Sequence, residues 1–91
     1  MNTTIHKTEL PVYEGSYSIP LPEGHKILSV GNARNSLCVW YECSNGRPFV
    51  TVEFFLAVTG GYLPQTPGWT FQGTVILQDG YYVTHVYTRT K

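Results

Sequence analysis

The chain has 91 residues, of which 42% are hydrophobic and 13% charged, and its six Lys and Arg balance its six Asp and Glu. A chain of this length forms a single domain, residues 1–91, and is too apolar to be disordered. Because a net charge of zero gives no field that attracts phosphate backbones or anionic lipid, we expect neither general nucleic-acid binding nor membrane binding.

Short β-prone segments follow one another along the whole chain, and apolar residues nowhere recur with a helical period over ten residues. Turns rich in Gly, Pro and Asn separate them. The sequence therefore predicts an all-β fold, a small antiparallel sandwich or barrel-like meander of about six to seven strands. The expected strands are 3–10, 15–21, 26–30, 37–43, 48–59, 69–77 and 81–89.

Three features refine this arrangement. Pro20 and Pro22 favour an edge position for the second strand, because proline donates no ladder hydrogen bond. Asn45-Gly46 has the residues of a type I′ turn and predicts a hairpin between 37–43 and 48–59, and Asp79-Gly80 predicts a second hairpin. Residues 48–59 alternate strictly, with one half-apolar face that a second layer or a partner is expected to cover in part.

Residues able to support catalysis or metal binding are few. Cys38 and Cys43 are separated by an odd offset in one strand, which points them to opposite faces and predicts two buried free thiols. Two cysteines and three scattered histidines do not provide a zinc site, so no metal or cofactor is expected. Asp79, the single aspartate, lies in a turn, and no nucleophile–base motif accompanies the serines. We therefore expect a protein that is not an enzyme. The N-terminus lacks the pattern of a secretion signal, which favours a cytoplasmic location.

Aromatic residues give the clearest functional signal. Seven Tyr, four Phe and two Trp exceed the needs of one small core, although Trp40, Phe54, Phe71 and Tyr87 are expected to fill it. The longest irregular segment, Gly60–Trp69, has glycines that could act as a hinge and prolines that stiffen it, and we interpret it as a lid. The predicted ligand-binding residues are Tyr62, Trp69, Tyr81, Tyr82, Arg34, Arg47 and Arg89, with a site at Arg47 in the first hairpin as the alternative.

Several short stretches are shared with a known group of proteins. They are the segments 5–7, 22–30, 37–40, 59–64, 71–74 and 83–87, with the patterns IHK, PxGxKILSV, LCVW, TGGYLP, FQGT and VTHVY, where x is an unmatched position. In these the chain resembles a family of short phage- and prophage-encoded proteins with no assigned activity. The resemblance implies a phage or prophage origin, and a location in the host bacterial cytoplasm, and it transfers no catalytic residue.

Two functional hypotheses follow. In the first, a phage accessory protein counters host defence without chemistry by sequestering a small nucleotide-derived signalling molecule, stacking its base on Tyr or Trp and holding phosphate with Arg. In the second, a protein-binding module or small virion-associated protein docks on a host or virion protein through a strand edge and its tyrosines. We also expect a homo-oligomer, a symmetric dimer or larger ring, because association would cover aromatic surface and protect strand edges.

Overall fold

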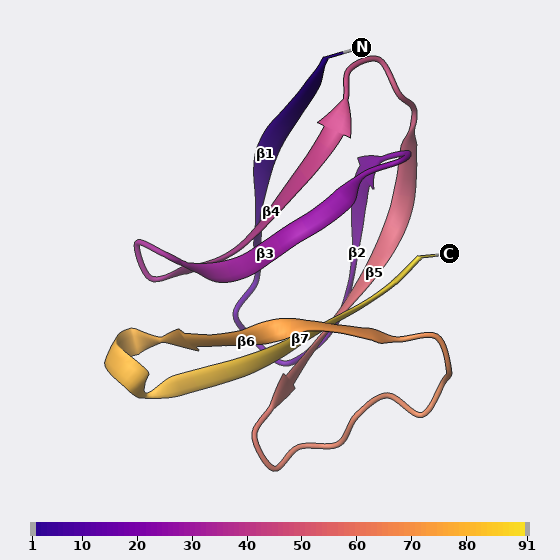
Figure 1. Cartoon of the computed structure of the whole chain (residues 1–91). Helices are drawn as coiled ribbons and strands as arrows, with labels where there is room; N and C mark the ends of the chain where they lie inside the picture. Colours follow the sequence, from indigo (N-terminus) through magenta and orange to yellow (C-terminus); the bar gives the residue numbers. More distant parts are fainter. Residues whose placement is uncertain (1, 91) are drawn as a thin grey trace.

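Seven strands build the part of the chain that the structure, a computed structural model, describes, namely residues 2–90 (Figure 1). One short 3₁₀ turn at Gln78–Gly80 is the single helical element in that range, which confirms the all-β prediction. The strands are β1 (Thr3–Leu10), β2 (Gly15–Pro22), β3 (Lys26–Ala33), β4 (Ser36–Ser44), β5 (Phe49–Val58), β6 (Thr70–Leu77) and β7 (Tyr82–Thr90).

The strands form two antiparallel sheets that pack face to face. One sheet has the order β1-β4-β3 and the other the order β2-β5-β7-β6 (Figure 1). Alternate residues of each strand point into the space between the sheets, as the period of two predicts. The buried core cluster consists of Leu10, Leu21, Leu37, Val39, Val52, Phe54, Leu56, Val75, Leu77 and Val86.

The two sheets approach each other most closely where β3 crosses β6. A Cβ atom on Gly73 would lie 2.7 Å from Cγ2 of Val30, so the backbone of β6 can pass there only as glycine. Gly73 also has a φ of 151° and lies beside a register shift in β6. A second link between the sheets follows β6, where the amide of Gln78 donates a 2.7 Å hydrogen bond to Oδ1 of Asn35, in the turn after β3. No ladder joins β1 to β2 in residues 2–90, so the sandwich is closed along one side and open along the other.

The hairpin predicted at Asn45-Gly46 is wrong. A turn does occur there, with Gly46 at a φ of 79°, but β4 pairs with β1 and β3 while β5 pairs with β2 and β7. The turn therefore carries the chain from one sheet to the other. Strict alternation cannot distinguish the two cases, because the residues that would lie side by side in a hairpin instead face each other across the core of a sandwich.

The expectation that Trp40, Phe54, Phe71 and Tyr87 fill the core is wrong except for Phe54, since Trp40 and Tyr87 are half-buried and Phe71 is 53% exposed. Three other expectations from the sequence are confirmed. β2, which contains Pro20 and Pro22, is an edge strand, and residues 78–81 connect β6 to β7 as a hairpin. Cys38 and Cys43 are buried free thiols. β3 continues three residues beyond its expected end, because the turn occupies only Arg34 and Asn35, whose φ angles are 52° and 62°. No helix in the described residues has the length and apolar character needed to cross a membrane.

The irregular segment 59–69 connects β5 to β6, the two strands that flank β7. Since β5 and β6 both run antiparallel to β7, this segment must return along the outer side of the four-stranded sheet (Figure 1). Trp69 contacts Phe55 there, with ring centroids 5.9 Å apart. The expectation that another layer covers part of the outer face of β5 is met by this segment.

Candidate functional site

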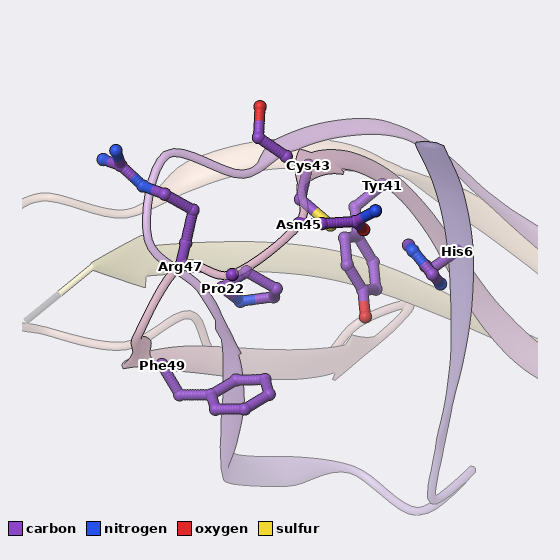
Figure 2. Close-up of a pocket in the computed structure, with 9 residues that line it drawn as sticks. His6, Pro22, Tyr41, Cys43, Asn45, Arg47 and Phe49 are labelled. Atoms are coloured by element: carbon purple, nitrogen blue, oxygen red, sulfur yellow. The ribbon is translucent and has the colours of Figure 1, made fainter. Parts of the chain in front are cut away.

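One hollow lies between the sheets at their open end, and we call it the mouth (Figure 2). It encloses about 380 Å³. This volume is within the range of small-molecule sites, roughly 300–1,000 Å³. Four strands and the β4–β5 connection contribute its lining: His6, Pro22, Tyr41, Cys43, Ser44, Asn45, Gly46, Arg47 and Phe49.

One wall of the mouth is a pair of rings. His6 on β1 and Tyr41 on β4 are cross-strand partners on the inner face of their sheet, and their rings stack with centroids 5.9 Å apart and planes inclined by 29°. Nε2 of His6 lies 2.8 Å from the hydroxyl of Thr4, which fixes the orientation of the imidazole. The pair therefore presents a preformed flat surface to the space between the sheets.

Beside the His6 nitrogens, the Tyr41 hydroxyl is the other polar group of this wall. Figure 2 shows the ring extending from β4 into the space between the sheets, and the hydroxyl makes no hydrogen bond with another of residues 2–90. Burial, with a smaller contribution from Cys43, raises the pKa of Tyr41 above its ordinary value. The phenol is thus protonated at neutral pH and offers both a donor and an acceptor.

The opposite side of the mouth is apolar and its rim is charged. Phe49 at the start of β5 has 69% of its surface exposed, and Pro22 lies across from it on the adjacent strand. Arg47 extends outward at the rim in Figure 2 and forms a 2.9 Å ion pair with Glu23. Both side chains of that pair are about half exposed, so the pair is weak and its guanidinium is available to an anion.

A second hollow of about 270 Å³ lies beneath the start of the segment 59–69. His85 on β7 lines it and is held on both sides, with Nε2 2.9 Å from the Thr59 hydroxyl and Nδ1 2.9 Å from the Thr74 hydroxyl. Nε2 therefore attaches the start of the segment to β7, while Nδ1 is held by β6 of the same sheet. Ala57, Leu63 and Tyr87 make the rest of this hollow largely apolar.

The predicted site residues do not converge. Trp69 and Arg89 lie together, since the guanidinium lies 4.6 Å from the Trp69 ring centroid, donates from Nε and Nη2 to Glu53, and donates from Nη1 to the Pro67 carbonyl. This cluster clamps the segment 59–69 against the sheet. Tyr81 and Tyr82 lie at the other end of the nine-residue strand β7.

The two remaining arginines are also apart. Arg34 and Arg47 occupy the turns at opposite ends of β4, a nine-residue strand. That length corresponds to roughly 30 Å, too far for one small ligand. Tyr62 is 92% exposed and makes no ring contact in the described part of the chain. Tyr82 instead lies near Glu14 and Tyr17, and burial first, then these neighbours, raise its pKa.

Of the seven predicted residues, Arg47 alone lines the mouth. His6, Tyr41 and Phe49 were not among them. His6 and Tyr41 are 35 positions apart in sequence and become neighbours through the β1–β4 ladder. In the sequence, the alternation of each strand indicates on which face His6 or Tyr41 lies. It does not indicate which strand pairs with which.

Comparison with known proteins places the chain in a family. A family model described as a domain of unknown function, DUF7352, matches residues 1–91. The chain belongs to the DUF7352 family. No curated protein and no solved structure matches it. The DUF7352 model covers the whole sandwich, including all four strands that line the mouth.

Proposed function

We propose that this DUF7352 protein binds and sequesters a small nucleotide-derived molecule in the mouth, without catalysing a reaction. The observation that supports this proposal is the combination of stacked rings, an exposed phenylalanine and a rim guanidinium around one hollow of about 380 Å³. Aromatic faces accept a base by stacking, and a guanidinium pairs with phosphate through two parallel hydrogen bonds.

In this proposal each group has a role. A planar base enters between the His6–Tyr41 wall and Phe49, where the free Tyr41 hydroxyl forms a hydrogen bond to its edge. A phosphate at the rim replaces Glu23 as the partner of Arg47. Breaking the Arg47–Glu23 ion pair costs little free energy because that pair is exposed. With no net charge on the chain, affinity depends on these contacts and not on long-range attraction.

The absence of catalysis in this proposal rests on the chemistry of the lining. His6 is the one imidazole that lines the mouth, and no carboxylate among residues 2–90 lines the mouth to orient it. Its Nε2 is already engaged by Thr4. Binding without turnover is what a sequestering protein requires.

The biological setting belongs to the same proposal. The resemblance to phage- and prophage-encoded proteins supports a role inside an infected bacterium, where removal of a nucleotide signal would blunt host defence. Expression of the chain in bacteria carrying a nucleotide-signalling defence tests that role. We expect phage yield to rise with the wild-type chain and not with Phe49→Ala.

Direct binding tests the site. Calorimetry and thermal shift against a panel of mono-, di- and cyclic nucleotides should identify a ligand of the wild-type protein. Phe49→Ala should weaken binding by about tenfold or more, since stacking contributes roughly 1–3 kcal/mol per base. Arg47→Ala should weaken it by a similar factor, since hydrogen bonds to charged groups contribute roughly 1.5–3 kcal/mol. Tyr62→Ala is the control, because Tyr62 is exposed and remote from the lining. Loss of binding in Tyr62→Ala with full binding in both mouth variants would place the site on the segment 59–69 instead.

One observation favours the alternative, a protein-binding module. β1 presents an eight-residue edge to which no other strand is paired among residues 2–90. Such an edge can accept an extended peptide by strand addition. A host protein that protects β1 amides from hydrogen exchange, with no nucleotide bound at any concentration, would support this second function.

A further inference from the structure

The two sheets of the sandwich have four edges, and three of them are protected. β3 and β6 cover each other, since Asn32 Nδ2 donates to the Ile76 carbonyl at 3.0 Å and the two strands touch at Gly73. β2 carries Pro20 and Pro22, which remove amide donors. These devices are the ones by which proteins prevent uncontrolled strand pairing.

β1 is the edge that lacks them. It runs for eight residues without proline, and pairs on one side with β4 in an unbroken register from Thr3 to Leu10. Every second residue of such a strand directs its amide and carbonyl away from the sheet. All its residues before Thr8 are exposed, so an incoming strand would meet no covering segment.

The charges on β1 indicate which strand pairs with its free edge. Lys7 and Glu9 project from the same outer face, two positions apart, and neither forms an ion pair within residues 2–90. A second β1 aligned antiparallel about Thr8 brings Lys7 opposite Glu9 of the partner subunit, and Glu9 opposite Lys7 of the partner subunit. Opposite charges at directly facing positions stabilise an antiparallel pair.

We propose that β1 pairs with β1 of a second copy, antiparallel and with Thr8 on the two-fold axis. The dimer joins the two three-stranded sheets into one continuous sheet, and the edge of each copy protects that of the other. Neighbouring registers are worse. An axis at Lys7 sets like charges against each other, and an axis at His6 leaves Lys7 opposite Ile5 of the partner subunit. The zero net charge of the chain adds no repulsion between copies.

Charge exchange on β1 tests the register. We expect the wild-type protein to sediment at twice the 10.2 kDa of one chain. Lys7→Glu and Glu9→Lys should each weaken the dimer by about tenfold or more, because each change turns two attractive pairs into two repulsive ones. An equimolar mixture of the two variants should restore dimers, as should the Lys7→Glu/Glu9→Lys double variant.

Lys26→Glu is the matched control. Lys26 is an exposed lysine on β3, the other edge strand of the same sheet, and this change should leave the dimer intact. A monomer at all concentrations up to about 100 μM overturns the proposal, since specific dimers form well below that concentration. Tighter association of the Lys7→Glu variant also overturns the proposal, because it would show that Lys7 prevents strand pairing in the wild-type protein. Neither residue lines the mouth, so this test and the nucleotide test fail independently.

Discussion

Replacing either of two threonines on β7 by valine should change the free energy of unfolding in opposite directions, which tests our description of the core. Thr84 and Thr88 both point into the sandwich and both are buried. The Thr84 hydroxyl has no hydrogen-bond partner among the described residues. The Thr88 hydroxyl accepts a 2.8 Å hydrogen bond from Nε2 of Gln72, which lies at the register shift of β6.

Valine has nearly the shape of threonine and replaces the hydroxyl with a methyl group. At Thr84 the change removes a buried polar group that costs roughly 1–3 kcal/mol to desolvate, so Thr84→Val should raise the free energy of unfolding by about 1 kcal/mol. At Thr88 it leaves a half-buried Gln72 amide without its acceptor, so Thr88→Val should lower that free energy by about 1 kcal/mol.

Urea denaturation and thermal unfolding measure both changes. In a domain of this size, 1 kcal/mol shifts the melting temperature by about 4–8 °C, so the two variants should differ by roughly 8–16 °C. Unchanged urea m-values would show that the unfolded states are comparable. If Thr84→Val destabilises as much as Thr88→Val, the Thr84 hydroxyl has a partner in solution, such as a buried water, and the reasoning fails.

Three further predictions address the closed side, the clamp and the tyrosines. Gly73→Ala should lower the free energy of unfolding by about 2–5 kcal/mol in urea titrations, through its positive φ and its contact with β3, whereas Gly46→Ala, with open space around it, should cost only about 1 kcal/mol. Arg89→Ala should release the segment 59–69, so amide hydrogen exchange should become faster in this segment and stay unchanged in the β3–β4 hairpin. An equal increase in the segment and in the hairpin would refute the proposal that Arg89 holds the segment against the sheet. The pKa values of Tyr41 and Tyr82 are raised in the folded protein, so as pH rises the unfolded chain loses these two protons first. Their contribution to the free energy of unfolding should therefore be fully present below pH ~10 and be lost as pH rises through the folded pKa values. A free energy of unfolding that stays constant between about pH 9 and 12 would contradict this.

The sequence predicted the strands well because alternation and turn residues are local signals. Expected strand ends at 3, 10 and 15 agree with the structure, and Pro20 and Pro22 indicated the edge position of β2. The Asp79-Gly80 hairpin is present for the same reason. Each of these features depends on the conformational limits of a few neighbouring residues.

Strand pairing could not be predicted in the same way. Val39 and Val52 have identical alternation whether they are neighbours in a hairpin or opposed across a core, and the Asn45-Gly46 turn permits either. β4 has both of its edges occupied, by β1 and β3, so no edge is left for β5. This competition involves residues far apart in the chain, and a single sequence does not reveal it.

The predicted site was dispersed for a related reason. Aromatic residues in loops were selected over those in strands, but Trp69 is used by Arg89 and Phe55 to attach the segment 59–69. His6 and Tyr41 were not among the predicted site residues. Their association depends on the β1–β4 register, which local patterns do not specify.

The open side of the sandwich explains why both proposals involve β1. The seven strands follow one another around the core from β1 through β4, β3, β6, β7 and β5 to β2, and the β3–β6 contact closes the side opposite the gap. A gap between the first and last strands leaves the inner face of β1 accessible at His6, where the mouth forms, and leaves its edge unpaired beside Lys7. Proline in β2 prevents the simplest closure, a β1–β2 ladder, because two of the required amides are missing. The same prolines therefore leave both the mouth and the β1 edge uncovered by β2.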